Sequence, residues 1–134
     1  MTSAIVCDAS VLVLMVFDEP SSAAAHALTK SRRLYAPSLL RYELAQVTAR
    51  RCIREPASAG LILEAFSLSL RLPVRLVTPS WTQVIELART YGLSAYDASY
   101  LELARSLRIP LATFDKRLGQ AADKLGLRAV PDTQ

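Results

Sequence analysis

Short apolar runs alternate along the chain with longer segments in which apolar residues recur at helical spacing. Runs such as Ile5–Cys7 lie between polar or turn-forming residues, which is typical of buried strands. Runs of this kind predict strands over 5–7, 34–36, 74–77, 111–113 and 129–130. The helical patterns predict helices over 10–17, from after Pro20 to about 30, and over 37–51, 59–70, 79–92, 94–107 and 116–125. Strands separated by helices predict an α/β fold, with a central, mostly parallel sheet and helices on both faces.

The size and composition are those of one globular domain. The chain has 134 residues, of which 51% are hydrophobic and 21% are charged, so we expect a single domain over 1–134. The longest uncharged apolar run, Ala9–Phe17, is too short to span a bilayer. Asp8 interrupts the only candidate leader sequence, which also lacks a basic start. These features predict a cytoplasmic protein that does not enter a membrane.

Cysteine and histidine, which often carry chemistry, are scarce in this chain. Cys7 and Cys52 lack CxxC spacing, and we expect Cys7 to be a small buried hydrophobe rather than half of a disulfide. His26 is the only histidine, so it cannot by itself supply a zinc site or a catalytic triad. The candidate chemistry must therefore come from other side chains.

The net charge favours an anionic partner. Sixteen basic residues against twelve acidic ones give a formal charge of +4, and thirteen of the basic residues are arginines. Arginine can form two parallel hydrogen bonds with a phosphate, which favours nucleic acid as the partner. Because many basic domains bind no polyanion, the charge alone does not decide the function.

Two aspartates closely follow predicted strands. Asp8 comes directly after the first strand, and Asp115 comes just after the strand at 111–113. The carboxyl ends of parallel strands form the edge at which α/β proteins place their sites. Each aspartate also precedes a helix, so each could instead serve only as an N-cap.

Two further carboxylates lie on the inward faces of predicted helices. Glu43 is four residues before Val47, within the apolar stripe of its helix, and Asp97 is four residues before Leu101. A partly buried salt bridge would also explain Glu43. The capping box that begins at Ser94 would also explain Asp97.

Together the four carboxylates predict a metal centre. Two come from strand ends and two from helices that cover the sheet, so all four can meet at one edge. Carboxylates in one pocket repel each other, and a hard cation relieves that repulsion. Ligands that are all oxygen favour Mg²⁺ or Mn²⁺ over zinc. The hydroxyls of Ser10 and Thr113 could join the same edge, or could merely cap or pack.

Four segments carry a resemblance to a known family. They are VCDASVLVLMV, APSLLRYELAQV, LSAYDASYLELARSLRIPLATFDKRL and AADKLGLRAV. These segments resemble the PIN-domain ribonucleases and, most specifically, the VapC toxins of bacterial and archaeal toxin–antitoxin pairs. The resemblance covers almost the whole chain, and only the stretch from about 55 to 71 is generic.

The resemblance assigns roles to the same four acids. The first family aspartate falls on Asp8, and the helix glutamate falls on Glu43. The aspartate of the YDA motif falls on Asp97, and that of the T-x-D turn falls on Asp115. Since every acidic position is filled, the resemblance implies a PIN fold and an active enzyme that cleaves RNA with Mg²⁺ or Mn²⁺. It also implies a homodimer and inhibition by a cognate VapB-like antitoxin.

The acids and the basic side chains near them suggest a division of roles. We expect Asp8, Glu43 and Asp97 to bind metal directly, and Asp115 to bind a second ion or to orient a water molecule. Nearby cations could steer the RNA backbone, although cations at a helix C-terminus are favourable in any case. The candidates for RNA binding are Arg50, Arg51, Arg54, Lys116 and Arg117.

Three other functions fit parts of this pattern. A phosphoacceptor receiver domain needs a second acid beside Asp8 and a lysine after a late strand, but Ala9 and a proline stand at those places. A phosphatase with a D-x-D motif needs an aspartate where Ser10 stands. A catalytically silent PIN module that binds RNA or protein is the remaining alternative, and the complete acid set argues against it.

Overall fold

The computed structural model describes residues 3–17 and 22–131, which fold around a parallel sheet of four strands. In spatial order the strands are β3 (Val74–Leu76), β2 (Arg32–Ala36), β1 (Ser3–Cys7) and β4 (Leu111–Ala112). The central position of β1 agrees with its sequence, because an uninterrupted apolar run suits a strand that is covered on both faces. Ile5, Val6 and Cys7 are all buried. The predicted α/β fold is confirmed.

The described residues form seven α-helices and one short 3₁₀ helix, η1. They are α1 (Ala9–Val16), α2 (Ser22–Thr29), α3 (Leu39–Arg54), η1 (Pro56–Ser58), α4 (Ala59–Ser69), α5 (Trp81–Tyr91), α6 (Ala95–Leu107) and α7 (Lys116–Lys124). These helices confirm the predicted ones to within a few residues, and α3 continues past Arg51 to Arg54. The predicted start of the second helix beside Pro20 lies outside the described residues. Within those residues, no helix combines the length and hydropathy needed to cross a membrane.

The strand predicted at 129–130 is wrong. The chain here makes a single parallel bridge, between Leu111 and Arg128. The Ala129 amide donates a hydrogen bond to the Leu111 carbonyl at 2.9 Å. The next donor toward the sheet would be the amide of residue 131, and Pro131 has no amide hydrogen. The pairing therefore stops after one residue.

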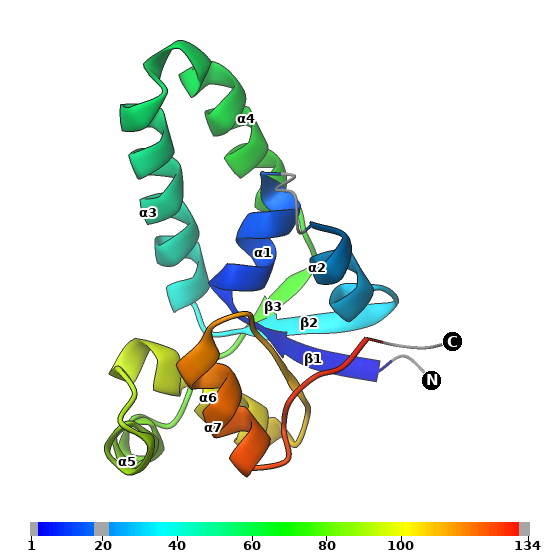
Figure 1. Cartoon of the computed structure of the whole chain (residues 1–134), viewed down its shortest axis with the longest axis vertical. Coiled ribbons are helices and arrows are strands. Elements are labelled where there is room, and N and C mark those ends of the chain that lie inside the picture. The colour runs from blue at the N-terminus through cyan, green and yellow to red at the C-terminus, as the bar shows by residue number, and fades with distance from the viewer. Residues whose placement is uncertain (1–2, 18–21, 132–134) are drawn as a thin grey trace.

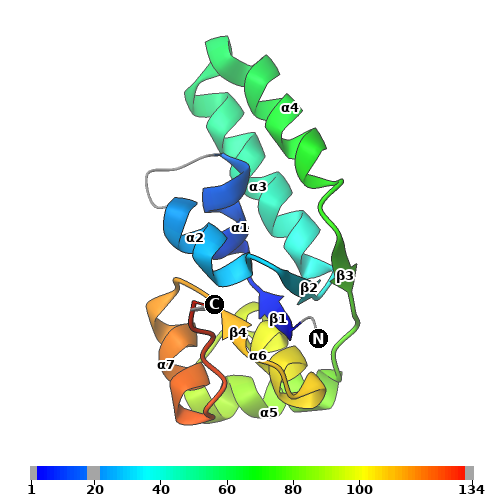
Figure 2. The same ribbon diagram turned by 90° about the vertical axis from the view of Figure 1, so that its right-hand side faces the viewer.

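The helices form a layer on each side of the sheet. Helices α1 to α4 lie on one side and α5 to α7 on the other, in both views (Figures 1 and 2). α6 packs against β1 and β4 and is buried along all of residues 98–104. The two most polar side chains in this stretch are satisfied. Ser99 Oγ donates to the Tyr96 carbonyl at 2.6 Å, and Glu102 accepts from the Ser80 amide at 3.2 Å.

α3 and α4 form a hairpin that extends away from the sheet (Figures 1 and 2). Only the beginning of α3 is anchored in the core, where Leu40, Leu44 and Thr48 are buried. At its far end, Ile53 and Arg54 are exposed. One helix therefore has a core-facing end beside the sheet and a basic, solvent-exposed end on the hairpin.

Candidate active site

Asp8 lies at the carboxyl end of the central strand β1. Its carboxylate caps α1, because Oδ1 accepts a hydrogen bond from the Val11 amide at 3.3 Å. Ser10 Oγ donates to the same oxygen at 2.6 Å, and Thr113 Oγ1 donates to Oδ2. The residue is 5% exposed. Burial raises the pKa of Asp8 to about 6, against the effect of these hydrogen bonds, and the Glu43 carboxylate adds to the rise.

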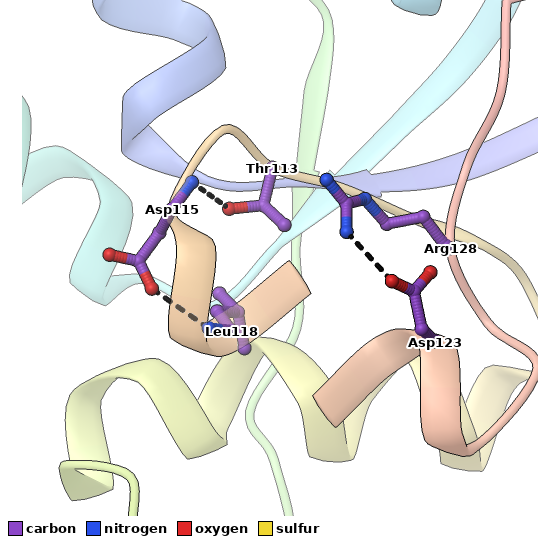
Figure 3. Close-up of polar contacts among 5 residues, drawn as sticks. All are labelled: Thr113, Asp115, Leu118, Asp123 and Arg128. Carbon is purple, nitrogen blue, oxygen red and sulfur yellow. Dashed lines mark hydrogen bonds and ion pairs between the residues drawn. The ribbon is translucent and has the colours of Figure 1, made fainter. Parts of the chain in front are cut away.

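The same two hydroxyls hold the loop between β4 and α7. Ser10 Oγ accepts a hydrogen bond from the Phe114 amide at 2.9 Å, and Thr113 Oγ1 accepts one from the Asp115 amide at 3.0 Å. Asp115 in turn caps α7, since its Oδ2 accepts from the Leu118 amide at 2.8 Å (Figure 3). Each hydroxyl donates to the β1 carboxylate while it accepts from the loop. This shared network joins the ends of β1 and β4.

Glu43 approaches the site from α3 and is half-buried. Its Oε1 accepts a hydrogen bond from the Tyr100 hydroxyl of α6 at 2.6 Å. Burial raises the pKa of Glu43, the bond from Tyr100 lowers it, and the Asp97 carboxylate raises it. Among the described residues no basic side chain forms an ion pair with Glu43, so a salt bridge does not account for its inward position.

Asp97 lies in the first turn of α6 and is also half-buried. Its amide donates to Ser94 Oγ at 3.0 Å, so Ser94 caps the helix as expected. Burial raises the pKa of Asp97, and the Asp115 carboxylate raises it further, whereas Ser94 and Arg117 lower it. The cap therefore explains why the helix begins here. It does not explain why the Asp97 carboxylate lies close enough to Asp115 to be repelled by it.

The four carboxylates interact pairwise along this edge of the sheet. Glu43 raises the pKa of Asp8, Asp97 raises that of Glu43, and Asp115 raises that of Asp97. Ionising all four therefore costs free energy that a bound cation would offset. The atoms that could bind a metal here are all oxygens, which fits Mg²⁺ or Mn²⁺. No three His, Cys, Asp or Glu side chains of the described residues lie close enough to hold one ion, so the acids interact in pairs rather than as a closed cage.

The chain matches the model of the PIN domain family over residues 5–124. It belongs to the PIN-domain family. Ribonuclease VapC12 of Mycobacterium tuberculosis is 31% identical over 121 residues, which are 87% of this chain and 91% of the relative. Ribonuclease VapC3 of Pyrobaculum aerophilum is 28% identical over 121 residues, which are 87% of this chain and 92% of the relative. The resemblance to VapC ribonucleases drawn from the sequence is confirmed.

Solved structures share the fold of this PIN domain. The Pyrobaculum aerophilum protein PAE2754 has a TM-score of 0.73 at 20% identity, covering 93% of this chain and 88% of that one. Mycobacterium tuberculosis VapC20, a sarcin-ricin loop cleaving toxin, has a TM-score of 0.68 at 16% identity, covering 96% of this chain and 100% of that one. At such low identities, these likenesses concern the fold alone.

The basic residues predicted to bind RNA fall into two groups in this PIN domain. Arg117 lies near the acids, since its charge lowers the pKa of Asp97. Its guanidinium donates a hydrogen bond to the Gly92 carbonyl at 2.5 Å, which holds it beside the start of α6. Lys116 is exposed next to it, at the first position of α7. These two cations belong to the same end of the sheet as the acids.

The other three arginines predicted to bind RNA lie toward the C-terminal end of α3, on the hairpin. Arg54 comes eleven residues after Glu43, which is about 16 Å along a helix. Arg51 lies over the Phe17 ring, 4.4 Å from its centroid. Arg50 and Arg54 are exposed and border a cavity of about 400 Å³. The helix therefore carries these cations away from the carboxylates.

Tyr100 is the site residue that the sequence analysis missed. It is 1% exposed, and its hydroxyl donates to Glu43. A buried tyrosine needs a partner for its hydroxyl, and Tyr100 is three residues after Asp97 on the same face of α6. The available signal is this pairing of a tyrosine and an aspartate on one inward helix face.

Proposed function

We propose that this PIN domain is a Mg²⁺- or Mn²⁺-dependent endoribonuclease and the toxin of a toxin–antitoxin pair. The observation that carries the proposal is the set of Asp8, Glu43 and Asp97, whose pKa values are all raised at the carboxyl edge of the sheet. These are the positions to which the family resemblance assigns its acids. Relatives named as ribonucleases, at 28% and 31% identity, support RNA as the substrate.

Asp8, Glu43 and Asp97, which interact in pairs, would supply the carboxylates that bind metal. Asp115 would orient a water molecule or help to hold a second ion. When bound, the ion would polarise the scissile phosphate and make a water molecule more acidic. The two hydroxyls that donate to Asp8 keep its carboxylate in one orientation. Hydrolysis adds the water oxygen to phosphorus and releases the 3′ oxygen, so the products carry 5′-phosphate and 3′-hydroxyl ends.

The RNA backbone needs positive charge beside these acids. Arg117 lies near enough to Asp97 to lower its pKa, and Lys116 directly follows Asp115. Exposed Arg50 and Arg54 on the hairpin would contact RNA that extends beyond the site. Arg51, which packs on an aromatic ring, would contribute less. An RNA substrate would place the protein in the cytoplasm.

The direct test is the metal dependence of cleavage. RNA cleavage should stop in EDTA and return with Mg²⁺ or Mn²⁺ but not with Ca²⁺, which prefers a larger and less regular ligand shell. Asp8→Asn protein, purified in the same way, controls for contaminating nucleases. Full cleavage by the pure protein in excess chelator would exclude the metal mechanism. RNA binding without cleavage in any of these metals would identify the silent binding module instead.

A VapB-like antitoxin is the second part of the proposal. It would cover the acidic edge and present a cation to Asp8 and Glu43, the pKa values of which are raised chiefly by burial and also by a neighbouring carboxylate. Expression of this chain alone should arrest growth. Co-expression of the small protein encoded beside it should restore growth and block cleavage in vitro. Toxicity that the neighbouring protein leaves unchanged would contradict the pair but not the nuclease.

A homodimer is the proposed assembly, and an uncharged aromatic groove supports it. Tyr42, Trp81 and Tyr96 are 75%, 63% and 66% exposed. They border a cavity of about 380 Å³, and none of its twelve lining residues is charged. Exposed aromatic residues are enriched at protein interfaces, whereas RNA would require cations that this groove lacks. Light scattering should give the mass of a dimer for the wild type and of a monomer for Trp81→Lys; a monomeric wild type would contradict the assembly.

A further inference from the structure

We propose that Tyr100 is a positioning residue of the metal centre, whose hydroxyl orients the Glu43 carboxylate toward the other acids. The inference rests on the metal-dependent nuclease proposed above. Its basis is the hydrogen bond from Tyr100 Oη to Glu43 Oε1, which is 2.6 Å long and joins α6 to α3.

The two side chains differ in their freedom to move. Tyr100 is 1% exposed and is among the largest fully buried side chains, so packing fixes its ring and the position of its hydroxyl. Glu43 is only half-buried and has three rotatable side-chain bonds. A fixed donor therefore selects one orientation of a flexible acceptor. A hydroxyl that donates to a carboxylate also favours its ionised form, which is the form that binds a cation.

The position of Tyr100 on α6 extends its effect to a second acid. Asp97 and Tyr100 are three residues apart and project from the same face of the helix. α3 and α6 lie on opposite sides of the sheet (Figure 1). The bond from Tyr100 to Glu43 therefore sets the position of the α3 acid relative to the α6 acid.

A tether between the two helices is the competing explanation of this bond. Both explanations predict that Tyr100→Phe, which keeps the ring, lowers the stability of the fold. Only the positioning role predicts weaker metal binding. We expect the affinity for Mn²⁺ to fall about 10–100-fold, as for other groups that orient a metal ligand. The rise in melting temperature that Mn²⁺ produces should shrink accordingly.

Tyr35 of β2 provides the matched control. It is half-buried, packs against the core and makes no hydrogen bond to the four acids, so Tyr35→Phe removes the same hydroxyl away from the site. Its affinity for Mn²⁺ should equal that of the wild type. Glu43→Gln completes a double-mutant cycle. If the Tyr100 hydroxyl acts through Glu43, adding Tyr100→Phe to Glu43→Gln should cause no further loss of affinity.

Calorimetric titration of the full chain with Mn²⁺, read beside RNA cleavage, decides between the outcomes. Weaker Mn²⁺ binding by Tyr100→Phe but not by Tyr35→Phe supports the positioning role. Equal binding by Tyr100→Phe and the wild type, or losses that add in the cycle, overturns it. A wild type that neither binds Mn²⁺ nor cleaves RNA overturns the proposed function itself. That last result is separate, because it needs no comparison with a variant.

Discussion

Asp8 and Asp115 have the same local structure in two different surroundings. Each follows a strand and caps the next helix by accepting from the amide three residues on. Both also contact Thr113, Asp8 through its carboxylate and Asp115 through its amide. Yet Asp8 is buried with a pKa raised to about 6, whereas Asp115 is exposed. Because a cap needs no burial, the burial of Asp8 is a feature that capping leaves unexplained.

The difference follows from how far each aspartate lies beyond the end of its strand. Asp8 directly follows Cys7, the last residue of β1, which lies between β2 and β4. Asp115 lies three residues beyond Ala112, the last residue of β4. Thr113 is still buried there, but the chain is exposed over residues 114–117. The same short sequence pattern therefore places one carboxylate inside the site and the other at its rim. Cap geometry alone does not distinguish them.

Catalysis is where the two aspartates should differ most. Asp8→Asn should lower RNA cleavage by more than the roughly 10–100-fold expected of a group that only orients a ligand. Glu43→Gln and Asp97→Asn should match it, while Asp115→Asn should stay within that range. Single-turnover rates in saturating Mg²⁺ measure the effect. A wild-type rate for Asp8→Asn would remove that residue from the site, and equal losses at Asp8 and Asp115 would erase the distinction between them.

Much of the fold could be predicted because its elements have strong and distinct periodicities. The wrong prediction arose where hydrogen bonding, rather than periodicity, determines where a strand ends. The expected strand at 129–130 contains apolar residues but is followed by Pro131, which cannot continue a ladder. The inward carboxylates Glu43 and Asp97 could be recognised because they contradict the apolar stripes of their own helices.

The contacts between distant elements could not be predicted. Tyr100 and Glu43 are 57 positions apart in the sequence, and Thr113 and Asp8 are 105 apart. Periodicity says which face of a helix is buried, but it gives no distance between two faces. The double use of the Thr113 hydroxyl, as donor to one aspartate and acceptor from the amide of another, also depends on the register between β1 and β4. Such contacts need coordinates.

The stability of the metal-free protein should separate the two aspartates next. Burial raises the pKa of Asp8 from 3.8 to about 6, which corresponds to at most about 3 kcal/mol at neutral pH. Asp8→Asn removes this charge and keeps a cap oxygen, so it should raise the free energy of unfolding by about 1–3 kcal/mol. Asp115→Asn should change it by only a few tenths. Urea denaturation at pH 7.5 in EDTA provides the measurement. An Asp8→Asn variant less stable than the wild type would contradict the expectation that the buried Asp8 charge destabilises the metal-free fold.

The pH dependence of the free energy of unfolding gives an independent check that ionised Asp8 destabilises the fold. The folded pKa of Asp8, about 6, lies above its ordinary value of 3.8, so the folded state binds the proton more tightly. The stabilisation from that proton is complete below about pH 4 and is lost as the pH rises through 6. The wild type should therefore lose stability relative to Asp8→Asn between pH 4 and 7, and the two stability curves should converge at acid pH. Parallel curves would show that Asp8 is not the titrating group.

Alanine substitutions should give the smallest and most specific difference. Asp115→Ala removes a helix cap at an exposed position, so it should cost about 1 kcal/mol, or about 3–5 °C in melting temperature for a chain of this size. Asp8→Ala removes a cap and a buried charge together, and the two changes have opposite effects on stability. In EDTA this variant should therefore lose less stability than Asp115→Ala, or gain stability. Mg²⁺ should then raise the melting temperature of the wild type by mass action and leave that of Asp8→Ala unchanged. In Mg²⁺ the variant should therefore become less stable relative to the wild type than it is in EDTA. If instead both alanine variants lose the same amount in EDTA and Mg²⁺ has no effect on the wild type, Asp8 is a cap like Asp115.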